Sequence, residues 1–214
     1  MVGFLRIFLA VLSVIVLIAM VCGAAAEFSL PQFGLGTVLV WKIEGAEYEE
    51  TFVARLASFS PDRFFEWENS AGQQGTVFMP ERAVAEAKGY EISSQFATGK
   101  DKKTRNETTL WLSRRVFIEL KEKKTARWNL NGVETRLKFI EEASVSVEVN
   151  RNVTELPVIR AADDRNGIWS FLNQQENPLM VHYEIRNYRQ TLASVTTGAP
   201  DALRWIKGRK LPLT

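Results

Sequence analysis

The sequence has almost no cysteine or histidine, with one residue of each among 214. A disulfide scaffold requires paired cysteines, and the usual zinc sites require several cysteine or histidine ligands. Both classes are therefore excluded, together with catalysis by a cysteine–histidine pair. From this composition we expect neither a metal site nor a cofactor.

The chain also lacks a dominant charge, because Lys and Arg number 27 and Asp and Glu number 25, which leaves a net charge of +2. No global field therefore directs it to nucleic acid or to acidic membranes. The 13 Gly and 7 Pro are too few for a collagen-like or low-complexity chain. Six Trp and 13 Phe instead predict a large aromatic core. The length suits one domain with an anchor.

The N-terminus has the pattern of an export signal. Arg6 precedes an apolar run over residues 7–21, and Ala24 and Ala26 supply the small side chains that a signal peptidase requires. We expect residues 1–26 to be a signal peptide cleaved after Ala26 or, alternatively, an uncleaved membrane anchor. Either outcome exports the body of the chain to the periplasm or the exterior, in the second case attached to a membrane.

Most of the remaining chain alternates between apolar and polar residues, which predicts strands. We expect a Pro/Gly-rich linker at 27–36, a β-rich domain at 37–199 and a basic tail at 200–214. One short helix is predicted over residues 80–88, with Pro80 at its first position and Gly89 after its end. The predicted strands are 37–43, 51–59, 63–67, 76–79, 110–112, 116–120, 126–130, 133–138, 145–149, 158–159, 168–172, 179–185 and 191–195.

These elements predict a mainly β fold: a single curled antiparallel sheet, half-barrel or sandwich-like, with one short helix and an N-terminal hydrophobic signal or anchor helix. The clearest local signal is Asn131-Gly132, since a type I′ turn requires two residues with positive φ. A two-residue loop there pairs Trp128 with Thr135 and Leu130 with Val133. This pairing places Trp128, Leu130 and Val133 on one apolar face of the hairpin.

Catalytic signals are weak. His182, the only imidazole, falls on the polar side of its predicted strand, and no nucleophile stands ready to use it as a base. A carboxylate-dependent hydrolase of an envelope polymer stays open as an alternative function, with Asp163, Asp164 and Glu176 as its candidate acids. The basic clusters at 100–105 and 121–124 are interpreted as solvated loops.

The aromatic content leaves two interpretations open. The side chains either fill a large core or line a concave apolar face that holds a lipid or a partner's hydrophobic segment. The candidate ligand-binding residues lie at alternate positions of predicted strands and are Trp128, Leu130, Trp169, Phe171 and Tyr183.

One C-terminal stretch contains the segments LPVIRA at 156–161, GIWSFL at 167–172 and ENPL at 176–179. This stretch resembles a family of uncharacterised secreted bacterial envelope proteins. The family shows two acids where Asn173 and Gln174 stand here, which weakens an acidic catalytic or metal-binding role at that turn. No activity comes with the resemblance. It implies an exported β-rich domain with a curled sheet like that of periplasmic lipoprotein carriers.

Together these features predict an exported cell-envelope protein that binds an apolar ligand or a protein partner without catalysis. The alternatives are the hydrolase and a purely structural envelope subunit. Expected partners are a lipid or other hydrophobic ligand, or an envelope protein, with no nucleic acid. Membrane association is expected only through residues 1–26.

Overall fold

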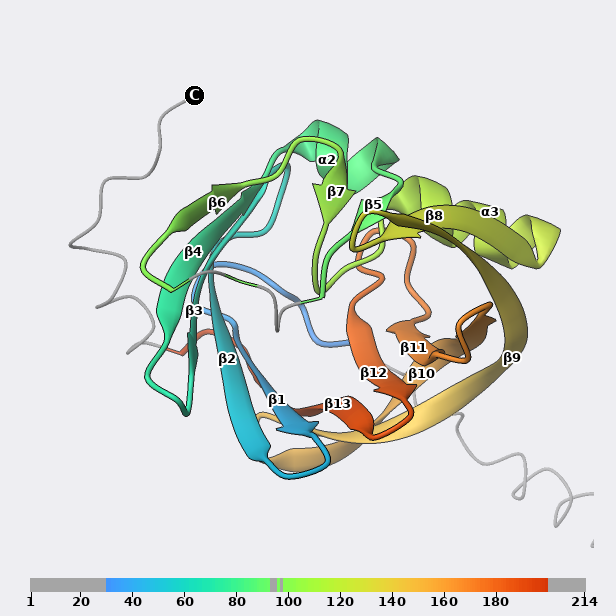
Figure 1. Ribbon diagram of the computed structural model, residues 1–214. Helices are drawn as coiled ribbons and strands as arrows, with labels where there is room; N and C mark the ends of the chain where they lie inside the picture. The colour runs from blue at the N-terminus through green and yellow to red at the C-terminus, as the bar shows by residue number, and fades with distance from the viewer. Residues whose placement is uncertain (1–29, 93–95, 97, 200–214) are drawn as a thin grey trace, which may run out of the picture. The chain divides into compact units, whose positions relative to one another are not determined.

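A single sheet of 13 strands forms the body of the computed structural model, which describes residues 30–92, 96 and 98–199 (Figure 1). The chain divides into two compact units, Met1–Leu30 and Pro31–Thr214, and the sheet belongs to the second. The predicted signal or anchor, the first three residues of the predicted linker and the basic tail lie outside the described residues. The prediction of a mainly β fold with one large curled sheet is confirmed.

Two helices, α2 and α3, accompany the strands in the described part of the chain. In chain order the elements are β1 (Val38–Glu44), β2 (Glu49–Ser58), β3 (Arg63–Asn69), β4 (Gln74–Met79), α2 (Glu81–Glu86), β5 (Gly89–Tyr90), β6 (Asp101–Lys103), β7 (Glu107–Thr108), α3 (Arg114–Lys123), β8 (Thr125–Leu130), β9 (Val133–Val149), β10 (Asn152–Asp163), β11 (Ile168–Leu172), β12 (Met180–Ile185) and β13 (Tyr188–Thr196).

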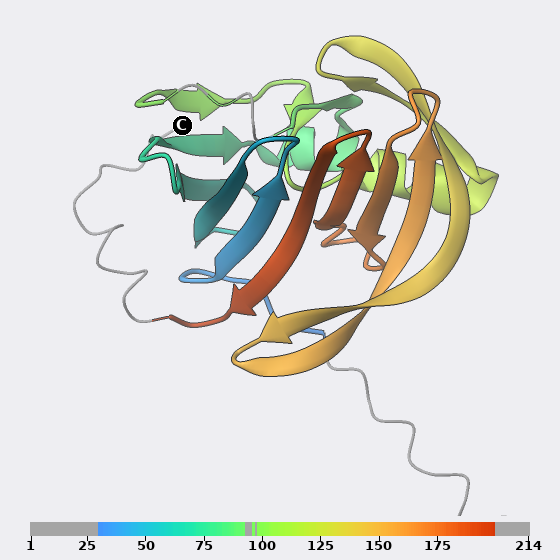
Figure 2. The same cartoon turned by 60° about the horizontal axis from the view of Figure 1, so that its bottom comes forward.

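The sheet curls until it meets itself. Its order is β6-β4-β3-β2-β1-β13-β12-β11-β10-β9-β8-β5-β7, and the far end of β9 pairs again with β13. The 17 residues of β9 span roughly 55 Å at about 3.3 Å per residue, enough for it to pair with β8 near its start and β13 near its end. Figure 2 shows β9 and β10 sweeping together across the sheet to reach β13. Most neighbours are antiparallel, whereas β4–β6, β5–β7, β5–β8 and β9–β13 are parallel.

The hairpin predicted at Asn131-Gly132 joins β8 to β9 in the expected register. Both turn residues have positive φ, 51° for Asn131 and 80° for Gly132, as a type I′ turn requires. Trp128 and Leu130 are buried as predicted, but Val133 is 48% exposed because it directly follows the turn, at the margin of the core. The expected strands 133–138 and 145–149 are parts of one strand, β9.

The predicted helix at 80–88 is confirmed as α2, although it is shorter. Pro80 is the N-cap rather than the first helical residue, and the first N–H of α2, that of Glu81, donates to Asp62 Oδ1 at 2.7 Å. Gly89 does not end the helix in a left-handed conformation but begins β5.

The prediction of a strand at 116–120 is wrong, because these residues belong to α3. Ser113 caps α3 by accepting from the N–H of Val116 at 3.3 Å, and Lys124 ends it at φ 59°. The run Val-Phe-Ile has high strand propensity, but the spacing of the buried Val116, Phe117 and Leu120 fits one face of a helix. The expected strand at 110–112 is reduced to a single bridge between Trp111 and Leu179.

Aromatic side chains fill the interior in connected clusters. On the β1–β3 side, Phe52 lies 5.9 Å from Trp41 and 5.8 Å from Trp67, measured between ring centroids. On the β8–β12 side, Trp169 is fully buried and stacks on Tyr183 at 3.7 Å. Such contacts add to the burial of large apolar surfaces, so these clusters supply much of the stability of the fold.

Replacing Trp169 by Ala therefore removes the centre of one cluster. We expect the free energy of unfolding, measured by urea denaturation, to fall by about 3–5 kcal/mol. Val153 is 80% exposed on β10, so Val153→Ala, the control, should change it by less than about 0.5 kcal/mol. Equal small losses in both variants would contradict the assignment of Trp169 to the core.

Candidate functional site

The five residues predicted to bind an apolar ligand all lie in the interior. Trp128, Leu130, Trp169, Phe171 and Tyr183 are each at most 3% exposed. Trp169 contacts three of the others, edge-on to Trp128 at 5.0 Å and stacked on Phe171 and Tyr183 at 5.8 and 3.7 Å. The structure thus brings most of the set together, as a packed cluster. Whether any of these residues contacts a ligand stays a prediction.

The candidate acids Asp163 and Glu176 do not converge, and the third, Asp164, is exposed and accepts from the N–H of Arg136 at 3.3 Å. Asp163 is buried at the turn before β11, where its carboxylate accepts from Trp169 Nε1 at 2.8 Å and from the N–H of Gly167 at 2.7 Å. Glu176 lies beyond the other end of β11, exposed and paired with Arg114 at 2.7 Å. The five residues of β11 alone span roughly 16 Å. This exceeds the separation of about 5–10 Å across which two carboxyls cleave a glycoside.

His182 lies half-buried on β12 and is held by neighbouring polar groups. Its Nδ1 is 3.0 Å from Thr191 Oγ1, and its Nε2 is 3.4 Å from Glu184 Oε2. Burial lowers the pKa of His182, and Arg189 and Arg160 lower it further, while Glu184 opposes the shift. The imidazole is therefore neutral at pH 7.

Arg63, at the start of β3, is a cation buried in the core. Its guanidinium lies over the rings of Phe59 and Trp111, at 4.8 and 4.9 Å from their centroids, and its Nη2 donates to the carbonyl of Glu176 at 2.7 Å. Loss of hydration lowers the pKa of Arg63 to about 9. Since Arg63 is only 1% exposed, it ties the loop after β11 to β3 and offers no surface to a ligand.

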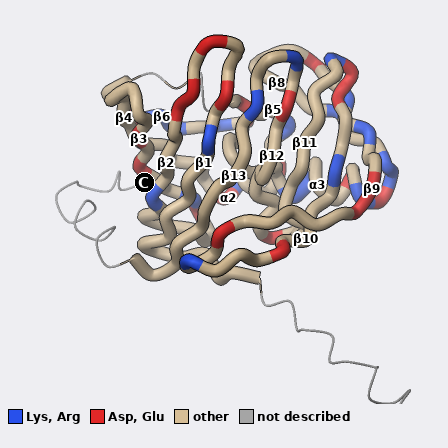
Figure 3. Tube along the Cα trace, turned by 90° about the horizontal axis from the view of Figure 1, so that it is seen from below, with Lys and Arg blue, Asp and Glu red and all other residues tan. Residues whose placement is uncertain are grey.

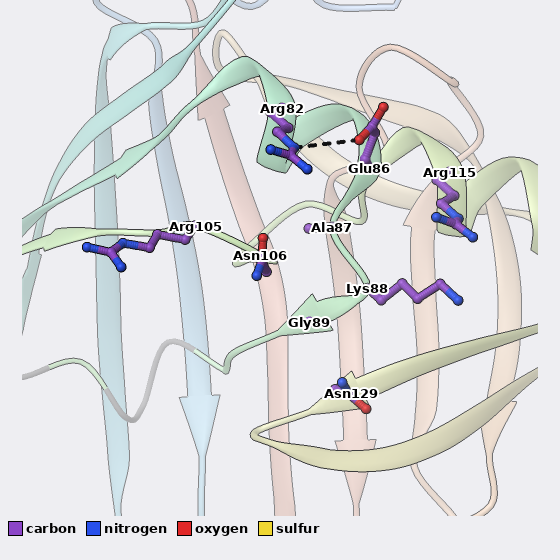
Figure 4. Close-up of a pocket in the computed structure, with 9 residues that line it drawn as sticks. All are labelled: Arg82, Glu86, Ala87, Lys88, Gly89, Arg105, Asn106, Arg115 and Asn129. Carbon is purple, nitrogen blue, oxygen red and sulfur yellow. Dashed lines mark ion pairs between the residues drawn. The ribbon is translucent and has the colours of Figure 1, made fainter. Parts of the chain in front are cut away.

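The polar surface beside the helices has a different character. A pocket of about 290 Å³ lies where α2, β5, α3 and β8 meet the segment before β7 (Figure 4). Cations and amides dominate its lining, and the only acid is Glu86. The lining residues are Arg82, Glu86, Ala87, Lys88, Gly89, Arg105, Asn106, Arg115 and Asn129.

Three further pockets adjoin this central one. The largest, of about 780 Å³, shares Glu86 and Arg115 with it and also contains Glu119, Glu122 and Glu176, so it is not predominantly basic.

The other two are rich in cations. A pocket of about 410 Å³ shares Gly89, Arg105, Asn106 and Asn129 with the central pocket and adds Lys103, Glu107 and Gly132. Another of about 290 Å³ shares Lys88 and adds Glu119, Lys123, Thr125, Ala126, Arg127 and Arg136. We call the central pocket and these two together the basic surface. Its lining contains eight Lys or Arg and three Glu.

Each Glu of the basic surface forms an ion pair, whereas several of its Lys and Arg do not. Glu86 pairs with Arg82 at 3.8 Å, Glu119 with Lys123 at 3.2 Å, and Glu107 with Lys102 at 3.1 Å. Burial alone would lower the pKa of Lys102, but Glu91 and Glu107 together raise it. Within the described residues, the cations of the surface that have no carboxylate partner are Lys88, Lys103, Arg105, Arg115 and Arg136.

The positive charge is a local property of this surface. Five of the 27 Lys and Arg, but only two of the 25 Asp and Glu, lie in residues 1–29 and 200–214, so the described domain has nearly balanced charge. Figure 3, viewed from the side away from the helices, shows acidic residues at the turn between β1 and β2.

Ser113 and Gly89 fix the backbone of the central pocket. Ser113 is buried, and its hydroxyl donates to the carbonyl of Ala87 at 2.5 Å while it caps α3, so it joins the end of α2 to the start of α3. The N–H of Gly89 donates to Asn106 at 3.1 Å, and a Cβ at Gly89 would lie 2.9 Å from that same carbonyl oxygen. Only glycine permits this approach between β5 and β7.

Sequence reasoning missed the basic surface because its cations come from segments far apart in the chain. Lys103, Arg105 and Lys123 fall in the clusters interpreted as solvated loops. They are exposed as expected, but the loop assignment is wrong for Lys103, which belongs to β6, and for Lys123, which belongs to α3. Nothing in the sequence places them beside Lys88 or Arg136. Pairing of β5 with both β7 and β8 brings these segments together.

Comparison with known proteins yields one distant similarity. No family model matches the chain, and no curated protein matches it. A crystal structure of a Bacteroides fragilis protein, described as exported and as having a YmcC-like fold, is similar with a TM-score of 0.36 and 10% identity, over 78% of this chain and 98% of the other. A TM-score this low establishes neither a common fold nor a common role.

Two general searches of the described residues gave negative results. None of the helices in this part of the chain is both long and apolar enough to cross a membrane. No group of three or more His, Cys, Asp or Glu there is arranged to hold a metal ion.

Stability should depend on the protonation of His182. Because its folded pKa lies below the ordinary value of about 6.5, the unfolded chain takes up a proton first as pH falls. The free energy of unfolding should therefore decrease between pH 7 and pH 5, measured by urea denaturation. His182→Gln should remove this part of the pH dependence, and an unchanged profile in the variant would contradict it.

The close approach at Gly89 predicts a second effect. Gly89→Ala should lower the free energy of unfolding by about 1–3 kcal/mol, since β7 must move away from β5. Gly34→Ala is the matched control, because an added Cβ there meets nothing within 4 Å. A variant at Gly89 as stable as that control would show that the contact is relaxed without cost.

Proposed function

We propose that this protein is an exported binding protein of the cell envelope and that its ligand is anionic. One observation carries the proposal: five exposed cations without carboxylate partners line three adjoining pockets on one surface of the domain. Unpaired cations on one side of a domain attract anions and orient them before contact.

The geometry favours binding over catalysis. The candidate acids Asp163 and Glu176 lie at opposite ends of β11 and are engaged in structural contacts, so they give the hydrolase alternative no support. The charged and amide residues that line the three pockets are Arg, Lys, Asn and Glu, and no histidine, cysteine or serine is among the lining residues. The Arg, Lys and Asn side chains can donate hydrogen bonds to an anion.

The location in the envelope rests on the sequence. The apolar run and the small residues of segment 1–26 support export, by cleavage or with an anchor. The aromatic residues led to the prediction of an apolar ligand or a protein partner, and binding of either stays a prediction. We favour an anionic ligand because the aromatic candidates are packed in the core, whereas the cations are exposed.

A binding assay with a sulfated polymer tests the proposal. The protein should bind fluorescein-labelled dextran sulfate, measured by fluorescence anisotropy, and should ignore neutral dextran. Affinity should fall as salt is added, because exposed charges are screened within about 10 Å at 0.1 M. The triple variant Lys88→Gln, Arg105→Gln and Arg115→Gln should bind about 10-fold more weakly, since each exposed pair contributes roughly 0.5 kcal/mol.

A control of equal charge change separates the site from net charge. Lys42, Arg151 and Arg165 are exposed cations elsewhere on the domain with no carboxylate partner in the described residues. Their triple replacement by Gln should change the affinity by less than about 2-fold. Equal losses in the two triple variants, or no binding by the unaltered protein, would overturn the proposal.

A further inference from the structure

The geometry of the basic surface points to its ligand class, and we propose a linear carboxylated polysaccharide that lies across all three pockets. This inference rests on the proposed function and narrows it. The inference is based on residues that the pockets share. The central pocket shares Arg105, Asn106 and Asn129 with the pocket of about 410 Å³, and it shares Lys88 with the pocket that reaches Arg136.

The cations are spread along the surface rather than gathered at one point. In Figure 4, Arg105 and Arg115 lie on opposite sides of the central pocket, and Asn106, Gly89 and Asn129 lie between them. Beyond Lys88, the third pocket continues to Arg136 on β9. A small anion reaches only one or two of these groups, whereas a chain with a charge on successive units reaches them all.

The exposure of the cations leads to the same conclusion. Each is solvated in the free protein, so a single ion pair with it strengthens binding only slightly. A site for one small anion would instead have several buried hydrogen-bond donors that point at the same position, because charge-assisted hydrogen bonds are strongest where water is excluded. Weak contacts of this kind hold a ligand firmly only when one molecule makes several at once.

Two amides suit the neutral part of such a polymer. Asn106 and Asn129 face the central pocket, and neither side-chain amide has a hydrogen-bond partner in the described residues. An amide offers two donors and an accepting oxygen, a match for sugar hydroxyls. Arginine at 105 and 115 offers a planar fork that binds a carboxylate with two parallel hydrogen bonds.

The same lining disfavours the two other polyanions. Single-stranded nucleic acid binds on aromatic side chains on which bases stack, and none of the three pockets has an aromatic residue in its lining. A surface that settles into a lipid bilayer carries large apolar side chains among its cations. Here the apolar lining consists of Ala87 and Ala126 with two glycines.

Oligogalacturonates of increasing length test the inference, because they carry one carboxylate per sugar and no sulfate. We expect monogalacturonate to bind at least about 100-fold more weakly than a long oligomer, and affinity to rise with length until the three pockets are occupied. Isothermal titration calorimetry with the full chain measures both quantities. An affinity per molecule that does not depend on length would overturn the inference.

Variants at the two ends of the surface add a positional test. Lys103→Gln with Arg105→Gln alters one end, and Arg127→Gln with Arg136→Gln alters the other. Each pair should weaken the long oligomer by at least about 3-fold and should lower the length at which affinity stops rising. The control pair, Arg151→Gln with Arg165→Gln, should do neither, and circular dichroism verifies that all variants are folded. Loss at only one end would contradict a ligand that spans the surface.

Competing polyanions complete the experiment. A single-stranded oligodeoxyribonucleotide and phosphatidylglycerol vesicles are compared with oligogalacturonate at equal charge concentration. If either binds more tightly, the inference of a polysaccharide ligand is wrong and the ligand belongs to that other class. Binding of dextran sulfate without binding of oligogalacturonate would refute this inference but leave the proposed function intact. Absence of binding to every anion would refute both.

Discussion

The packing around Trp169 is the contact on which the rest of the domain depends. Its ring stacks on Tyr183 at 3.7 Å and meets Trp128 edge-on at 5.0 Å, while its Nε1 donates to the buried Asp163 at 2.8 Å. This one side chain joins β8, β10, β11 and β12. Since a large aromatic buries roughly 150–250 Å² and its polar atom must be satisfied, the contact is both strong and directional.

The same cluster reaches the basic surface through Tyr90. Its ring lies 5.0 Å from Trp128 and 5.5 Å from Trp169, so β5 is held against the core by the residue that follows Gly89. Lys88 and Gly89 are thereby fixed at the centre of the basic surface, and Ser113 fixes the two helices around them. The core thus positions a surface whose own side chains are exposed and individually weak in binding.

This arrangement separates the two kinds of side chain by role. Aromatic residues supply stability in the interior, and we assign recognition to the unpaired cations outside, so a change at Arg105 or Lys88 should alter binding with little effect on folding. Because the described domain has nearly balanced charge, attraction arises from where its cations lie.

The sequence by itself determined the strand-rich class of the fold, the turn at Asn131-Gly132 and the helix α2, because alternation, turn chemistry and proline act over a few neighbouring residues. The prediction from the sequence was wrong at α3, because the cap at Ser113 and the burial of one helical face outweigh the strand propensity of Val116 and Phe117. Only the tertiary structure decided that the aromatic candidates are core and that cations from distant segments adjoin. The burial of the aromatic residues and the proximity of the cations depend on strands that pair although they are far apart in the chain, namely β9 with β13 and β5 with β7 and β8. The pattern of residues along the sequence does not indicate which distant segments pair.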